Sequence, residues 1–216
     1  MSGSEVASAS VGVSALASAP EWRKRLLFIV PLVAVAAVAL ILLSHAGSFL
    51  IINAPRPSDV IVVLEGEWPQ AVKLRNDGFA PKILLNAGTN WRVFGRTEYD
   101  LATEFLKSEK PAGMELCPTS AETTLEEAAD VQRCLAPLHV RRVLLVATNF
   151  DTRRVLGVYR AALPQYQWSI AASSAPYHDA DRYWKHRSWA KTVLNAWEQY
   201  LWWKLVQERH THPVAQ

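Results

Sequence analysis

A long apolar run near the N-terminus dominates the hydrophobic pattern of the chain. Leu26 to Leu43 contains no charged residue, and a helix of about 18 apolar residues can cross a hydrocarbon core of about 30 Å. A buried helix of a soluble domain would keep a polar face for water, which this run lacks. We therefore expect a transmembrane helix over residues 26–44, with Pro31 kinking it, a distortion that membranes tolerate.

The charges that flank this run predict its orientation. Arg23, Lys24 and Arg25 precede it, whereas the next residue of fixed charge is Arg56. The positive-inside rule then places the N-terminus in the cytoplasm and the rest of the chain outside. Residues 1–25 consist mainly of small side chains and are expected to form a disordered cytoplasmic tail.

A cleaved signal peptide is the alternative interpretation of the same run. Ser44-His45-Ala46 offers small residues for a cleavage site. Apolar cores of signal peptides span about 7 to 15 residues, and this one is longer. The pattern therefore favours a retained anchor in an inner (plasma) membrane of a bacterial type, and leaves cleavage open.

Short β-branched runs alternate with amphipathic stretches beyond a linker at residues 45–57, which indicates a different kind of structure. Alternation of strands and helices with short links is typical of a parallel sheet covered by helices on both faces. We predict an α/β, Rossmann-like three-layer domain over residues 58–208, followed by a tail at 209–216. The expected strands are 59–64, 82–85, 114–116, 143–146 and 168–171, and the expected helices are 69–77, 97–108, 124–135, 152–163 and 190–208.

Composition narrows the possible partners. The chain has 23 basic and 20 acidic residues spread along its length, for a net charge of +3, so it lacks the basic footprint of a nucleic-acid-binding protein. It also has nine Trp, and the last predicted helix is rich in them. We expect about half of these rings to pack on the sheet and the others to sit at the level of lipid headgroups. We therefore predict the membrane as a partner and do not expect a nucleic acid.

The two cysteines are expected to remain unpaired. An extracytoplasmic location would permit a disulfide, but we place Cys117 just after a strand and Cys134 at the end of the following helix. That helix would separate them by about 15 Å at 1.5 Å per residue, whereas a disulfide requires Cα atoms within about 7 Å.

Polar residues follow each of the first four predicted strands. In such sheets ligands bind beyond the carboxyl ends of the strands, so we expect these loops to form one binding rim. The candidate ligand-binding residues are Glu65, Gly66, Asn86, Gly88, Glu98, Thr124, Glu127, Thr148, Asn149, Asp151 and Arg154.

At these positions the chain resembles a widespread bacterial family of unknown function that includes the YdcF, SanA and ElyC proteins. The order and spacing of six short motifs match over roughly residues 57–165. The resemblance implies the same fold and a role in the cell envelope. The motifs are Asp59 to Leu64, Gly78 to Pro81, Asn86 to Gly88, Thr97-Glu98, Thr124 to Ala128 and Ala147 to Arg154.

The chain also departs from the family pattern. Glu65 and Glu67 stand where the family has glycines, Trp68 where it has an Arg, and Asp151 where it has a His. Loss of that His argues against catalysis by an imidazole acid or base, and two extra carboxylates make the first loop less suited to a phosphate than a Gly-rich loop.

Several candidate residues have structural interpretations that the sequence leaves open. Thr124 and Glu127 have the spacing of a capping box, and Asp151 or Asn149 has a side chain suited to capping the next helix. Glu98 lies in the first turn of its helix, where a carboxylate is favourable. Arg154 lies in a first turn, where a cation opposes the helix dipole; helix formation therefore does not explain it, and its removal is not expected to destabilise the domain.

We therefore expect a membrane-anchored envelope-biogenesis factor whose external domain binds a small anionic, nucleotide-like or lipid-carrier headgroup ligand. Arg154 would contact the anion, Thr148 and Asn149 would donate hydrogen bonds, and Glu98 would orient the Arg. A hydrolase or transferase using a metal held by Glu65, Glu67, Glu98 and Asp151, or a non-catalytic membrane scaffold, are the alternatives. The His residues have no metal-ligand spacing, no metal site is assigned, and catalytic residues and cofactor remain unknown.

Overall fold

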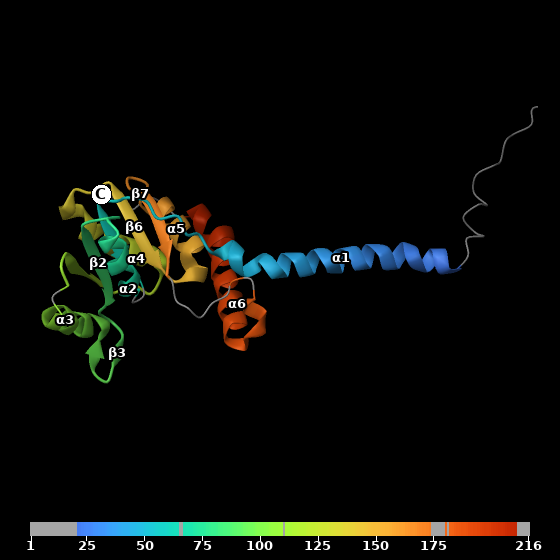
Figure 1. Ribbon diagram of the computed structural model, residues 1–216, viewed down its shortest axis with the longest axis horizontal. Coiled ribbons are helices and arrows are strands. Elements are labelled where there is room, and N and C mark those ends of the chain that lie inside the picture. The colour runs from blue at the N-terminus through green and yellow to red at the C-terminus, as the bar shows by residue number, and fades with distance from the viewer. Residues whose placement is uncertain (1–20, 65–66, 110, 174–179, 181, 211–216) are drawn as a thin grey trace, which may run out of the picture. The chain divides into compact units, whose positions relative to one another are not determined.

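The chain folds into two compact units, Met1–Ser44 and His45–Gln216. The computed structural model describes residues 21–64, 67–109, 111–173, 180 and 182–210 (Figure 1). The division falls at Ser44, where the sequence predicts that the apolar run ends, and the second unit includes residues 45–57, which were expected to be a linker.

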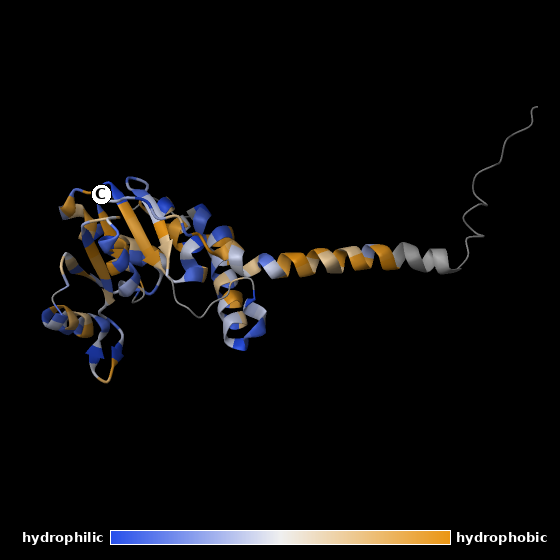
Figure 2. Cartoon of the chain, viewed as in Figure 1, coloured by the Kyte–Doolittle hydropathy of each residue, from blue (hydrophilic) through white to orange (hydrophobic). Residues whose placement is uncertain are grey.

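The first unit contains one long helix, α1 (Glu21–Leu50), whose last residues belong to the second unit. Its stretch Ile29–Leu50 is long and apolar enough to cross a membrane, and Figure 2 shows hydrophobic colouring along most of this stretch. The helix begins at Glu21, so residues 21–25 are helical and are not part of a disordered tail as expected. The rest of that predicted tail, residues 1–20, lies outside the described residues.

The second unit is built on a five-stranded parallel sheet with the strand order β5-β2-β1-β6-β7. Each predicted strand is present, and the fold class is confirmed. The third strand is longer than predicted, because the chain stays extended to Thr119. The strands are β1 (Val60–Val63), β2 (Lys82–Gly88), β5 (Met114–Thr119), β6 (Arg142–Ala147) and β7 (Gln167–Ala172).

Helices cover both faces of this sheet, as the near-continuous apolar strands require. On one face α2 (Trp68–Asn76) and α3 (Glu98–Glu109) pack over Ile61, Val63 and Ile83. On the other face α4 (Thr124–Leu135) and α5 (Thr152–Ala162) pack over Val60 and Val62. The three layers therefore form from alternate side chains of the same strands.

A disulfide joins Cys117 and Cys134, contrary to the sequence-based expectation. Their Cα atoms are 5.9 Å apart. The expectation placed Cys117 beyond the end of a strand, but β5 continues to Thr119, so Cys117 lies inside the strand and is fully buried. Since α4 runs back down over β5, its last turn brings Cys134 level with Cys117.

A separate hydrophobic cluster attaches the C-terminal helix to the domain. The helix α6 (Arg187–Trp202) continues into η5 (Trp203–Gln207) and η6 (Glu208–His210). Its buried face packs on Leu50 and on Phe150. Smaller elements are the β3–β4 hairpin (Arg92–Val93 and Arg96–Thr97), η2 (Ala136–Leu138), η3 (Asn149–Asp151) and η4 (Tyr183–Lys185).

Candidate functional site

The strand order places a topological switch point beside β1. The chain leaves β1 towards β2 on one side, and β6 occupies its other side. Ligands of open α/β sheets bind at such a point, outside the carboxyl ends of the strands. The loops after β2, β5 and β6 meet there and form the rim that the sequence predicts.

Arg154 is the centre of a hydrogen-bonded cluster at this rim. Its guanidinium donates from Nη1 to Thr124 Oγ1 at 2.6 Å and from Nη2 to Asp151 Oδ1 at 2.8 Å. The other carboxylate oxygen of Asp151 accepts a hydrogen bond from the Thr148 hydroxyl at 3.0 Å. The Arg154 side chain is only 12% exposed, so this cluster fixes a buried cation at the start of α5.

The first turn of α4 connects this cluster to β2. Thr124 accepts from Arg154, and one turn further along Glu127 Oε1 accepts from Asn86 Nδ2 at 2.6 Å. Asn86 is 3% exposed, and within the described residues its Oδ1 has no hydrogen-bond donor. Residues i and i+3 share a helix face, so one face of α4 links the ends of two strands.

The predicted capping box is correct in kind but one residue out of register. The cap is Thr123, whose hydroxyl accepts from the Glu126 backbone N–H while Glu126 accepts from the Thr123 N–H. Thr124 and Glu127 are therefore not the capping pair, and both point their polar atoms to the rim instead.

The remaining described candidates form separate local contacts. Glu98 Oε2 accepts the backbone N–H of Gly88 at 3.0 Å, which ties α3 to the end of β2. The expectation that Glu98 orients Arg154 is wrong for this structure, because Asp151 and Thr124 hold the guanidinium. Neither Asp151 nor Thr148 makes a side-chain cap hydrogen bond, and Asn149 contributes its backbone carbonyl to Thr152.

The metal alternative gains no support from the part of the chain that the structure describes. No three His, Cys, Asp or Glu side chains converge there in a way that could hold a metal ion. Glu65 and Gly66 lie outside the described residues, and Glu67 begins α2 without a side-chain cap bond.

Asp130 is a rim-supporting residue that the sequence did not single out. Its Oδ2 accepts from Thr119 Oγ1 at 2.8 Å and from the Ser120 N–H at 2.9 Å. Burial raises the pKa of this carboxyl, but those two hydrogen bonds and the Arg133 guanidinium outweigh burial, so the pKa is lowered overall. Asp130 thus stays ionised and holds the loop that leads to α4.

A pocket of about 400 Å³ opens beside Arg154, and the C-terminal helix forms one of its walls. Trp203 lines this pocket and is 5% exposed. Among the described residues, neither Trp203 Nε1 nor Arg154 Nε has a hydrogen-bond acceptor. Gly157 makes room for the Trp203 ring, since a Cβ there would lie 2.2 Å from it. We call this the Arg154 pocket; it is lined by Glu122, Thr123, Thr124, Leu125, Arg154, Val158, Gln199, Trp202, Trp203 and Gln207.

Sequence reasoning missed this contribution of α6. The cluster of Trp residues was a usable signal, but their spacing along one helix does not tell which ring faces the sheet. Only the path of the chain after β7 decides that, and a single sequence does not encode it in a local motif.

No model of a known protein family matches the chain, and no curated protein matches it. The resemblance to the YdcF, SanA and ElyC family therefore stays a prediction that rests on its six short motifs.

Proposed function

We propose that this protein is a membrane-anchored envelope factor of the YdcF, SanA and ElyC type. Its α/β domain lies outside the cytoplasm and binds a small anionic ligand in the Arg154 pocket. The observation that carries the proposal is the pair of buried N–H donors without acceptors, Arg154 Nε and Trp203 Nε1, which belong to residues lining one pocket. A buried donor without an acceptor costs about 1 to 3 kcal/mol, and a ligand that supplies acceptor oxygens would remove that cost.

Arg154 also suits an anion because of how it is held. Asp151 and Thr124 fix the plane of the guanidinium, and a fixed fork of N–H donors matches the oxygens of a phosphate or carboxylate. Three of the rim carboxylates have a donor of their own, since Asp151 pairs with Arg154, Glu127 with Asn86 and Glu98 with Gly88. They therefore repel an incoming anion less than free carboxylates would.

Two features support the location outside the cytoplasm. The apolar stretch Ile29–Leu50 follows three basic residues, which favours an anchor with its N-terminus in the cytoplasm. The Cys117–Cys134 disulfide fits an oxidising compartment.

The binding proposal is tested by thermal unfolding of the full-length protein in detergent. The probes are inorganic phosphate, a nucleoside diphosphate, and magnesium or manganese chloride alone. A ligand at 100 times its Kd stabilises the native state by about 2.7 kcal/mol, so we expect one of the phosphate-containing probes to raise Tm by several degrees.

Two matched substitutions locate the bound probe. Trp203→Phe removes the buried N–H but keeps a ring, and Arg154→Lys keeps the charge but loses the fork; both should reduce the Tm shift. Trp184→Phe is the control, because Trp184 is exposed and does not line the pocket; it should leave the shift intact. A shift produced only by the metal salts would favour the hydrolase or transferase alternative, and no shift with any probe would contradict the binding proposal.

A further inference from the structure

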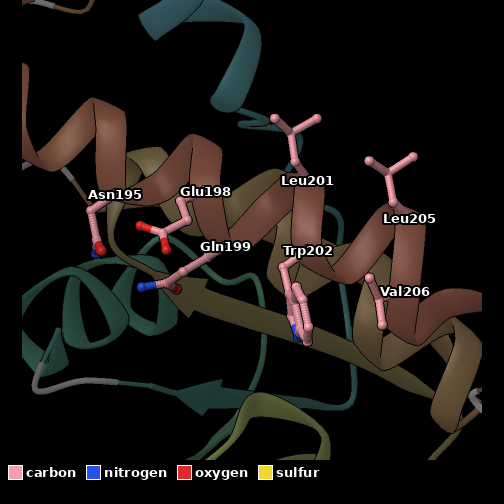
Figure 3. A pocket seen from close by; sticks show the side chains of 7 residues that line it. All are labelled: Asn195, Glu198, Gln199, Leu201, Trp202, Leu205 and Val206. Atoms are coloured by element: carbon pink, nitrogen blue, oxygen red, sulfur yellow. The ribbon is translucent and has the colours of Figure 1, made fainter.

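The outer face of the C-terminal helix carries a strip of exposed apolar side chains. It consists of Leu194, Leu201, Trp202, Leu205 and Val206, which we call the α6 strip, and they are 39% to 69% exposed. Figure 3 shows Leu201 and Leu205 projecting together from successive turns. Isolated exposed leucines are ordinary, but a contiguous apolar surface marks an interaction site.

The strip is not the face by which α6 joins the domain. Val193 and Ala196 point the other way and are buried in the core, and Trp203 is buried over Gly157 of α5. A helix at the surface of a soluble domain usually exposes a polar face opposite its buried one. The outer side of this helix carries the apolar strip beside the polar Asn195, Glu198 and Gln199, so an apolar environment there would remove the strip from water.

Charge around the strip favours a lipid surface over another protein core. Residues 185–209 contain five basic residues, Lys185, Arg187, Lys191, Lys204 and Arg209, and only two acidic ones, Glu198 and Glu208. Exposed Trp and Leu beside Lys and Arg are the combination found in helices that lie in the membrane interface, where basic side chains meet anionic headgroups.

Contacts inside the second unit bring α6 close to the end of the apolar run. The indole N–H of Trp197 donates to the carbonyl of Ala46 at 3.0 Å, and the Trp197 ring stacks on Phe49 at 5.2 Å between centroids. Ala46 and Phe49 follow Ser44 within the helix α1, so both lie within about 8 Å of Ser44 along the helix axis. Within the second unit, α6 thus packs on the segment that directly follows the apolar run.

We propose that the α6 strip rests on the surface of the lipid bilayer, with Trp202 and the leucines at headgroup depth and the neighbouring basic residues facing anionic lipids. The proposal rests on the membrane anchor of the proposed function. It also brings the bilayer next to the ligand site, because Trp202 belongs to the strip and also lines the Arg154 pocket. The pocket would then open beside the lipid headgroups.

The test places a fluorescent probe on the strip of the full-length protein in vesicles. Leu201→Cys is labelled with an environment-sensitive fluorophore, since both natural cysteines are in the disulfide. Leu101→Cys on α3 is the matched control, because Leu101 is 47% and Leu201 44% exposed. Vesicles contain lipids brominated on their acyl chains, with and without anionic headgroups. Interfacial helices sit about 5 to 10 Å into the boundary between headgroups and acyl chains. We therefore expect the probe at Leu201 to be quenched about three times as strongly as the probe at Leu101. The difference should be largest with anionic lipid.

Equal quenching at the two positions would overturn the docking proposal. A blue-shifted Leu201 probe that is not quenched, and whose shift grows with protein concentration in detergent, would show that a second copy covers the strip and would also overturn it. Alkaline carbonate extraction of the same vesicles tests the anchor separately. If the protein stays with the vesicles but Leu201 is not selectively quenched, only the docking proposal is refuted. If the protein is released from the vesicles, the anchor is refuted, whichever probe is quenched.

Discussion

At the scale of single residues, Arg154 shows both what the sequence reveals and what it hides. Its position in the first turn of a helix marked it as a residue placed for a reason other than helix formation. The sequence could not reveal its partner Thr124, which lies thirty positions away and contacts it through tertiary packing alone. Asp151 also offsets the unfavourable dipole, because it pairs with Arg154 at i and i+3.

These contacts reverse the sequence-based expectation for Arg154→Ala. The substitution leaves the partly buried Asp151 without its cation and Thr124 without its donor. We expect a loss of about 1 to 3 kcal/mol in the free energy of unfolding, measured by urea denaturation. An unchanged or higher stability would mean that the ion pair is dispensable and that the dipole conflict dominates.

Asp59 makes the stability of the domain sensitive to acid. Hydrogen bonds from the Arg142 side chain, from the Arg142 N–H and from the Arg141 N–H lower the pKa of Asp59 from 3.8 to about 2. Because the folded state has the lower pKa, the contribution is complete above pH about 4 and is lost as the pH falls towards about 2. Asp59→Asn should therefore cost about 1 kcal/mol at pH 7 and much less at pH 2. The check is urea unfolding of both proteins at the two pH values; a gap that stays constant between them would contradict it.

At the scale of elements, the sequence predicted every strand of the sheet and every helix that covers it, because each of these segments has a hydrophobic period of its own. The ends of the elements were less predictable. β5 extends to Thr119 through Cys117 and Pro118, residues that carry no strand signal, and this extension is what brings the two cysteines together. The β3–β4 hairpin was missed because its strands are two residues long and exposed.

At the start of α4, two adjacent threonines have different roles: Thr123 caps the helix, and Thr124 contacts Arg154. Thr123→Ala removes the capping box and should cost about 1 kcal/mol of stability. Thr123 lines the Arg154 pocket, but its hydroxyl bonds Glu126 and not Arg154, so its effect on ligand binding should be the smaller of the two. Thr124→Ala leaves the cap but removes the acceptor of Arg154 Nη1, so it should weaken binding more than stability. Urea unfolding and the ligand-dependent Tm shift, measured on both variants, give the comparison. If Thr124→Ala instead lowered stability more than Thr123→Ala did and left binding unchanged, Thr124 would be the structural residue.

The disulfide closes a loop of 17 residues between β5 and α4. Cross-linking a loop of about this length stabilises a protein by about 3 kcal/mol in the chain-entropy model. The double variant Cys117→Ser with Cys134→Ser should lose a stability of that order in urea, and thiol labelling of the denatured natural protein from cells should find no free thiol. Free thiols in that experiment would mean that the domain does not reside in an oxidising compartment.

At the scale of the whole molecule, hydropathy alone divided the chain correctly at Ser44, but it did not predict how the second unit begins. Residues 45–57 were expected to be a simple linker. They are instead part of the fold, because Ala46 and Phe49 contact α6 and Ala54 pairs with Ile170 on the edge strand. The sequence alone did not predict which residues the aromatic side chains of α6 would contact.

This packing bears on the choice between an anchor and a cleaved signal peptide. Cleavage after Ala46 would remove the carbonyl that Trp197 binds. The fold therefore favours an intact chain at this point. Mass analysis of the purified protein should find the chain uncut between residues 44 and 47, and a form that starts near Gly47 would contradict the anchor.

The predicted orientation of the chain rests on the three basic residues that precede the apolar run. Alkaline phosphatase fused after Gln216 should be active, because that enzyme needs disulfides that form only outside the cytoplasm, and a fluorescent reporter that matures in the cytoplasm should stay dark. Replacing Arg23, Lys24 and Arg25 with Ala removes the charge bias that sets the topology. We expect this triple variant to lose phosphatase activity in part, whereas replacing Lys73, an exposed residue of α2, with Ala should not change it. An active cytoplasmic reporter on the natural chain would overturn the orientation, and with it the membrane-facing α6 strip and the external ligand site.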